Sequence, residues 1–443
     1  MRDNRRAFCE TIRMPDDAES QRMAARDAGR EPWGLWGSYL SDRQWGTVRE
    51  DYSADGDAWT FFPHEHARSR VYRWGEDGLL GISDSDGRLC FAPVFWNGKD
   101  RMLKERPFGL SNPQGNHGED LKDYFYHLDN TPTHSFMRGL YKYPQAAFPY
   151  AQLVEENGRR PRTEPEYELV DTGIFNEGRY FDIFVEYAKE NPEDIGIRIR
   201  AINRGPDHAP LTVLPTLWFR NTWSWGQAGA TKPEMHRAPH GAAIIAEPWG
   251  LPEYHLYCEA AGEFAFTDNE TNAGRLFGAK NPAPYLKDGF HDYLIDGKSD
   301  AINPSHCGTK AAAIYRRTLA PGEEWTIRLR LCRPPKPEPF GPAFDGLFEQ
   351  REKECAEFYE RRSPGLPAEL ALVQRSALAG LLWCKKFYYY PVIQWLQGDP
   401  TMPTPPAERW TGRNSFWKEL HAHDVISMPD SWEYPYFCAW DLM

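Results

Sequence analysis

Two hydrophobic patterns with different periods divide this sequence, and the change between them limits the possible folds more than any other feature. From about residue 66 to 333, apolar residues alternate with polar ones in short runs, and clusters of Gly, Pro, Asn and Asp separate the runs. A period of two is typical of β-strands with one buried face. Many short strands with little helix between them indicate an antiparallel sandwich rather than alternating strands and helices.

Five runs carry the clearest strand signals. Three of them alternate regularly, at 179–188, 195–203 and 324–332. The runs 88–95 and 211–219 are apolar on both faces and each contains a proline, so we expect buried strands interrupted at that residue.

The period changes after Cys332. The stretch 333–342 (RPPKPEPFGP) is rich in proline, which predicts an extended linker. Apolar residues at helical spacing then predict one helix to about Arg362 and a second over 368–390. Because the second helix is apolar on more than one side, we expect it to be buried between neighbouring elements.

These changes predict four parts of the chain. They are an N-terminal extension (1–32), an antiparallel β-sandwich domain (33–332), a proline-rich linker with its helix (333–366) and the first part of a helical domain (367–443). Since the sequence stops within an aromatic run, WEYPYFCAWDLM, we expect a fragment of a longer protein. A small helical appendage that packs these aromatics on the sandwich is the alternative.

The composition excludes several classes of function. The net charge of −12 gives no general attraction to nucleic acid or to anionic membranes. There is no apolar run of about 18 residues, and no secretory signal is readable, so we expect a cytoplasmic protein. The eight cysteines show no C-x-x-C pair, and motifs for dinucleotides or nucleoside triphosphates are missing. We therefore expect no cofactor.

The densest group of polar and aromatic residues lies at the C-terminal end. It contains Trp432, Glu433, Tyr434, Trp440 and Asp441. Carboxylates among aromatic rings suit cleavage of glycosidic bonds, because the rings hold the sugar and partial desolvation raises the pKa of one carboxyl until it can act as an acid. An aspartate after a tryptophan is also a common helix cap, so the pattern alone leaves both interpretations open.

Two segments are weaker candidates for metal binding. Residues 50–59 (EDYSADGDAW) resemble half of a calcium loop, but Phe62 stands where the closing glutamate should be, so we reject an EF-hand. His64 and His66 would face the same way on a strand, yet no third ligand has recognisable spacing. We therefore predict no metal site.

Four segments resemble the large bacterial members of glycoside hydrolase family 63: 40–59, 66–84, 97–150 and 432–441. The resemblance implies a β-sandwich followed by an (α/α)6 barrel, truncated here, and inverting hydrolysis of terminal α-glucosidic bonds in oligosaccharides or small glucosides. It implies Asp441 as the general acid and a general base beyond residue 443, so the chain alone is expected to be inactive. The residues expected to hold the sugar are Trp432, Glu433, Tyr434 and Trp440, with Tyr390 and Trp395 as further candidates whose alternative is packing between helices.

Two other functions remain open from the sequence. One is a glycoside phosphorylase of similar architecture, in which phosphate replaces the base. The other is a non-catalytic carbohydrate-binding sandwich, which predicts that residues 1–335 bind sugar unaided. In each case the expected partner is an oligosaccharide or small glucoside, with no nucleic acid and no membrane, and the oligomeric state is not readable.

Overall fold

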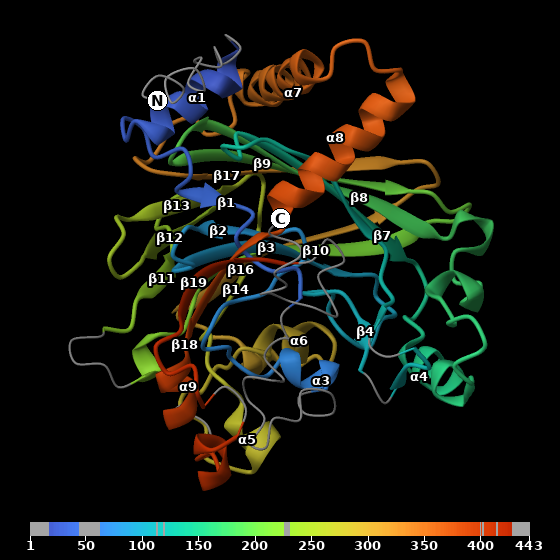
Figure 1. The fold of residues 1–443 in the computed structure, drawn as a ribbon, viewed down its shortest axis with the longest axis vertical. Coiled ribbons are helices and arrows are strands. Elements are labelled where there is room, and N and C mark those ends of the chain that lie inside the picture. Colours follow the sequence, from blue (N-terminus) through green and yellow to red (C-terminus); the bar gives the residue numbers. More distant parts are fainter. Residues whose placement is uncertain are drawn as a thin grey trace, which may run out of the picture.

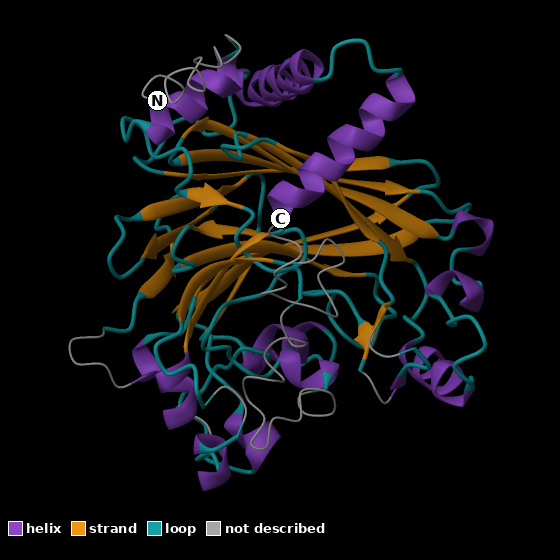
Figure 2. Ribbon diagram, viewed as in Figure 1, coloured by secondary structure: helices purple, strands orange, loops and turns teal. Residues whose placement is uncertain are grey.

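Two antiparallel β-sheets packed face to face form the centre of the molecule (Figures 1 and 2). The structure is a computed structural model that describes residues 17–43, 63–111, 114–117, 120–225, 231–398, 400, 403–412 and 415–427. It confirms a multi-sheet antiparallel β fold with some helices.

The first sheet has six strands and the second has nine. In spatial order, the six-stranded sheet contains β1 (Trp36–Gly37), β2 (Ile82–Asp84), β3 (Leu89–Trp96), β10 (Ala209–Phe219), β16 (Lys310–Leu319) and β14 (Glu263–Thr267). The nine-stranded sheet contains β15 (Cys307–Gly308), β11 (Glu234–Arg237), β12 (Ala243–Glu247), β13 (Tyr254–Cys258), β17 (Glu324–Cys332), β9 (Asp194–Asn203), β8 (Tyr180–Asn191), β7 (Phe136–Pro144) and β6 (Phe125–Asn130). Two small sheets pair β4 (Gly109–Leu110) with β5 (Asp120–Leu121) and β18 (Lys385–Pro391) with β19 (His421–Ile426).

The helices lie around these sheets. They are α1 (Ala18–Asp27), α3 (His64–Ala67), α4 (Tyr150–Arg159), α5 (Ala273–Phe277), α6 (Gly289–Leu294), α7 (Ala343–Arg362), α8 (Ala368–Trp383) and α9 (Val392–Gln397). No helix among the described residues is long and apolar enough to cross a membrane.

All five predicted strands are confirmed, as β8, β9, β17, β3 and β10. Their inward side chains form one core between the sheets, in which the Trp36 indole donates a hydrogen bond of 3.1 Å to the Tyr254 hydroxyl. The two prolines of the buried strands, Pro93 and Pro215, stand directly opposite each other in the β3–β10 pair. Because a proline has no N–H, placing the two together removes donors at a single step of the ladder.

Helix α7 covers the outer face of the nine-stranded sheet, as Figure 1 shows. Its predicted end at Arg362 is confirmed. Phe344 and Phe348 are buried against the sheet, where Gly196 of β9 leaves room for both rings. Helix α1 lies beside α7, and the buried carboxylate of Glu19 accepts hydrogen bonds of 2.7 Å from the N–H and the hydroxyl of Thr133.

The second predicted helix is shorter than the sequence indicates. Helix α8 ends at Trp383, and the residues expected to complete it form β18 instead. Tertiary contacts override the helical spacing here, because the N–H groups of Phe387 and Tyr389 donate to the carbonyls of Tyr39 and Trp74. Aromatic residues also suit a strand better than a helix.

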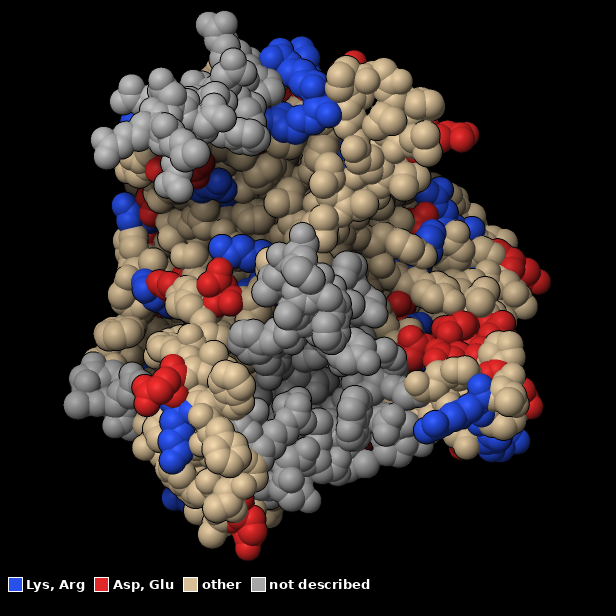
Figure 3. All heavy atoms as spheres, viewed as in Figure 1, with Lys and Arg blue, Asp and Glu red and all other residues tan. Residues whose placement is uncertain are grey.

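The expected burial of this helix between neighbouring elements is not observed in the described structure, where its outer face has no packing partner. Only Ala379 and Trp383 of α8 are buried. The exposed large side chains are Leu370, Leu372, Val373, Leu378 and Leu381, with exposed fractions of 55, 65, 65, 37 and 56%. Figure 3 shows that charged side chains are sparse over this helix.

The start of an (α/α)6 barrel is not confirmed. In the described part of 385–427 the chain forms β18, α9 and β19 instead of a second long helix. These elements pack on Tyr72 and Trp74 from the N-terminal half, so they belong to the same packed unit as the sandwich.

Helices α3, α5 and α6 lie on the opposite side from α7 (Figure 1). Phe290 of α6 is buried against outward-facing residues of the six-stranded sheet, including Val94, Leu214 and Ala312. This contact places α6 and its neighbours around the site described next.

Candidate functional site

A polar cavity of about 520 Å³ lies among α3, α5 and α6. Its lining residues are mostly charged: Glu65, Arg68, Arg101, Met102, Asn272, Arg275, His291, Asp292, Asp296 and Lys298. They come from three distant regions of the chain, at 65–68, 101–102 and 272–298, so only the tertiary structure creates this cavity.

Local contacts hold α6 at the cavity. Asp288, at the N-terminal end of α6, accepts hydrogen bonds of 2.7 Å from the Ser69 hydroxyl and 3.1 Å from the Asn272 amide. A Cβ on Gly289 would lie 2.5 Å from the Ala301 carbonyl oxygen, so this position accepts only glycine. The side chains that follow in the sequence are therefore held in place against the cavity wall.

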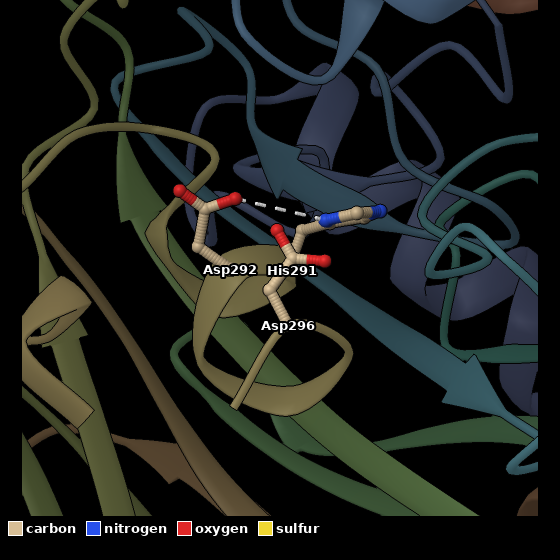
Figure 4. Close-up of side chains that lie close together, drawn as sticks. All are labelled: His291, Asp292 and Asp296. Atoms are coloured by element: carbon tan, nitrogen blue, oxygen red, sulfur yellow. Dashed lines mark ion pairs between the residues drawn. The ribbon is translucent and has the colours of Figure 1, made fainter. Parts of the chain in front are cut away.

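Three side chains from α6 and the next turn come together at the cavity, as Figure 4 shows. Nδ1 of His291 lies 3.9 Å from Oδ1 of Asp292, and ligand atoms of His291, Asp292 and Asp296 all lie within 4.8 Å of one another. Lys298 pairs with both carboxylates, at 3.4 Å from Asp292 and 3.1 Å from Asp296. Burial and the nearby Asp288 carboxylate raise the pKa of Asp292.

Arginines occupy the other wall of the cavity. Arg68 and Arg275 both pair with Glu65, at 3.1 and 3.3 Å, so this carboxylate partly offsets their charge. Arg101 is exposed, and its guanidinium lies 5.0 Å from the centre of the Tyr150 ring. Charged groups of both signs thus face a space large enough for a small polar ligand.

A second group of charged residues is fully enclosed between the six-stranded sheet and its covering loops. Arg106 donates to Asp77 at 3.0 Å, and Lys310 donates to Glu105 at 2.9 Å. The two positive charges, with burial acting against them, lower the pKa of Glu105 to about 2. The space among these side chains is about 20 Å³, which is too small for a sugar ring, so we assign them a structural role.

Glu76 and Lys287 complete this enclosed network. Burial raises the pKa of Glu76 to about 7, although the charge of Lys287 opposes the shift. Burial likewise lowers the pKa of Lys287 to about 8, with Arg106 adding to the effect. Asn269 donates to Glu76 at 3.0 Å.

Most of the residues predicted to bind or cleave the sugar lie outside the described residues. They are Asp441, Trp432, Glu433, Tyr434 and Trp440, and the acidic segment 50–59 is also outside. The structure does place Tyr390 in β18 and Trp395 in α9, with exposed fractions of 2 and 3%. Both pack with Trp74 in one hydrophobic cluster, which matches the packing alternative.

His64 and His66 lie on helix α3, so the expectation that they share one face of a strand is wrong. The ring of His64 packs against those of Phe108 and Tyr150, and burial lowers the pKa of His64 well below the usual value.

Sequence reasoning missed the group around His291. Its only local signal is the pattern H-D-x-x-x-D in HDYLID, which is too common to be specific. Arg68 and Arg101 are 223 and 190 positions away from His291 in the sequence and have no local signal at all, whereas Arg275 lies on the preceding helix α5.

A scan against protein-family models finds no match. Two solved structures are similar in part. A putative kojibiose phosphorylase from the human microbiome has a TM-score of 0.21 and 8% identity, over 49% of this chain and 24% of that one. A polysaccharide lyase has a TM-score of 0.25 and 11% identity, over 56% and 26%. These TM-scores are too low to indicate a shared fold.

The chain is similar to a protein of Saccharomyces cerevisiae, "Uncharacterized protein YMR196W". The two are 43% identical over 471 residues, which cover 96% of this chain and 43% of the yeast protein. The chain thus spans less than half the length of the curated relative that it matches.

Proposed function

We propose that this chain is the N-terminal part of a carbohydrate-processing enzyme, an inverting glycoside hydrolase that acts on terminal α-glucosidic bonds of oligosaccharides or small glucosides. One structural observation carries the proposal: an antiparallel sandwich is followed by a helix, α8, with exposed leucines on its outer face. A helical domain packed on that face would bury those leucines. The choice of inverting hydrolysis as the reaction is based on the resemblance of four segments to glycoside hydrolase family 63.

In this proposal the catalytic groups are divided between two parts of a longer protein. Asp441 donates a proton to the leaving oxygen, and the aromatic rings of Trp432, Tyr434 and Trp440 hold the sugar. Inversion requires a second carboxylate about 6.5–9.5 Å away that activates water. We place that base in the helical domain, and the greater length of the yeast relative supports such a domain.

We also propose a cytoplasmic location. The six cysteines in the part of the chain described here, Cys90, Cys258, Cys307, Cys332, Cys355 and Cys384, are all free thiols. Free thiols are typical of a reducing compartment, which supports the proposal.

The test compares the 443-residue chain with the longer natural protein that contains it. We expect the longer protein to release glucose from α-glucosides, with the β anomer appearing first by proton NMR. The shorter chain should release none, because it lacks the base. Asp441→Asn should lower kcat by about 100- to 10,000-fold, while Asp207→Asn, at an exposed carboxylate paired with Arg179, serves as the control and should have no effect.

Three outcomes would contradict the hydrolase. Glucose 1-phosphate formed only with inorganic phosphate would indicate a phosphorylase. Sugar binding by the 443-residue chain, with no turnover in the longer protein, would indicate a binding protein. An unchanged kcat in Asp441→Asn would remove this residue from the acid role.

A further inference from the structure

We propose that His291, Asp292 and Asp296 bind a divalent transition-metal ion at the edge of the polar cavity, and that Zn²⁺ fits this site best. The proposal is independent of the glycosidase assignment. It rests on three potential ligand atoms that lie within 4.8 Å of one another, and on a buried imidazole nitrogen without a hydrogen-bond partner.

The imidazole of His291 is held in an orientation that suits a ligand. The residue is only 6% exposed, and its Nδ1 makes no hydrogen bond. On the other side of the ring, Nε2 lies 3.0 Å from the carbonyl oxygen of Arg101. If Nε2 donates its proton to that carbonyl, the lone pair of Nδ1 points toward Asp292, 3.9 Å away. Metal-binding histidines commonly have their second nitrogen fixed in this way.

A second contact at Nε2 also leaves Nδ1 without a hydrogen bond. Nη1 of Arg68 lies 2.5 Å from Nε2 and could donate to it. The ring would then carry its proton on Nδ1, but a distance of 3.9 Å to Asp292 is too long for a hydrogen bond. Both arrangements leave Nδ1 unsatisfied. A cation on Nδ1 selects the one that donates to Arg101, and Arg68, which can only donate, must then move away from Nε2.

The two carboxylates, one on α6 and one just after it, approach the same space. Asp292 and Asp296 are four residues apart, and Figure 4 shows the Asp296 carboxylate beside the Asp292–His291 pair. Ligands of Zn²⁺ lie about 2.0–2.2 Å from the metal, so the three groups must move closer than they stand in the structure. The side chain of Asp296 is 42% exposed, which leaves it free to make this adjustment.

Lys298 occupies the place that the metal would take. Its ammonium lies 3.4 Å from Asp292 and 3.1 Å from Asp296, while its side chain is 53% exposed. An exposed lysine loses little when it turns to water, because ion pairs between exposed side chains contribute little to stability. Lys298 is therefore a competitor whose removal should favour the metal.

The other acidic group in the described structure shows the contrast. Asp120, Glu166 and Glu168 also come together, but all three contact the ammonium of Lys122, which is completely buried. The buried ammonium of Lys122 cannot turn to solvent to make room for a metal ion, and the group contains no histidine. Only the His291 group combines a free imidazole nitrogen with a cation that can leave.

The ligand types favour zinc over calcium. One imidazole nitrogen and two carboxylate oxygens match the ligands of Zn²⁺, and three protein ligands leave a position open to the cavity. Calcium requires six to eight oxygen ligands, which this group does not supply.

The test is a calorimetric titration of the chelator-treated chain with Zn²⁺, together with the visible spectrum of the Co²⁺-loaded chain. We expect one site that His291→Gln and Asp296→Asn each weaken by about tenfold or more, and that Lys298→Met strengthens. Asp300→Asn, at an exposed carboxylate just beyond the group, is the matched control and should bind like the unmodified chain. Ca²⁺ should give no heat of binding at this site.

Several results would overturn the proposal. Unchanged zinc affinity in Asp296→Asn, or no gain in Lys298→Met, would show that the ion binds elsewhere. Strong sulfur-to-cobalt charge-transfer bands would identify a thiolate ligand instead. Because Asp296 and Lys298 are exposed, their variants should fold normally, and circular dichroism checks this.

Discussion

At the scale of single residues, the enclosed network behind the six-stranded sheet predicts an unusual pH dependence. Burial raises the pKa of Glu76 from 4.5 to about 7 in the folded chain. The folded chain therefore binds the carboxyl proton of Glu76 more tightly than the unfolded chain does. The contribution of Glu76 to the free energy of unfolding falls as the pH rises from about 4.5 to 7. The loss amounts to about 3 kcal/mol.

Glu76→Gln should remove this dependence. The amide of the variant stays neutral and keeps an oxygen for the hydrogen bond from Asn269. We expect its free energy of unfolding to match the unmodified chain near pH 5 and to exceed it by about 2–3 kcal/mol at pH 7. Urea denaturation at each pH measures the difference.

Glu105→Gln is the matched control in the same network. The pKa of Glu105 is about 2, because Lys310 and Arg106 outweigh the effect of burial. Its contribution is therefore complete above pH 4.5 and is lost only as the pH falls toward 2. We expect the free energy of unfolding of this variant to be about 3–5 kcal/mol lower than that of the unmodified chain, with the same difference at every pH from 5 to 7. If the free energy of unfolding depended on pH in the same way in both variants, the pH dependence could not be assigned to Glu76.

At the scale of elements, helix α8 has two faces with different roles. On its inner face, the Trp383 indole donates to the carbonyl of Asp129 at 3.0 Å and stacks on His127 at 4.6 Å. Arg375 adds a charge-assisted hydrogen bond of 2.5 Å to the Asp129 carboxylate. The leucines of the outer face have no comparable contacts in the described structure.

This difference predicts opposite results for two substitutions in α8. Trp383→Ala should lower the free energy of unfolding by about 3–5 kcal/mol, because it leaves a cavity in the core. Leu372→Gln should change it by less than about 0.5 kcal/mol, because the side chain is already 65% exposed. Chemical denaturation of the 443-residue chain measures both. A large loss in Leu372→Gln would mean that another molecule covers the face, which size-exclusion chromatography would reveal as a second copy.

At the scale of the whole molecule, the proline-rich linker does not separate two independent bodies in the structure. After the linker, α7 returns to the sheet, and Arg328 pairs with Asp345 at 2.6 Å. Further along, Trp383 joins the same core as the strands of both sheets. The helices are thus part of the sandwich's own packing.

A protease site placed at 337–341 tests this arrangement. We expect the two pieces to stay together after cleavage and to elute as one species without denaturant, because Phe344 and Phe348 of α7 lie beyond the cut and stay buried against the sheet. Elution as two folded pieces would instead support the domain boundary that the sequence indicates at 332/333. An uncut chain carrying the same inserted site is the control.

Local periodicity explains what could be predicted from the sequence. The strands of the sandwich and helix α7 each bury one face, and a buried face leaves a regular pattern of apolar residues. The pattern does not report which strand pairs with which. Nor does it show that 385–391 forms a strand, since that depends on carbonyl groups of Tyr39 and Trp74 more than 300 residues away.

The candidate sites follow the same division. The sequence by itself determined an antiparallel sandwich followed by helices, and it supplied the resemblance behind the glycosidase proposal. Only the tertiary structure decided that His291 and its neighbouring aspartates line one cavity with Arg68, which follows α3, and Arg275 of α5. Arg68 and His291 meet although they are 223 positions apart in the sequence. Packing and electrostatics in the folded state select such contacts, and neither leaves a periodic signal in the sequence.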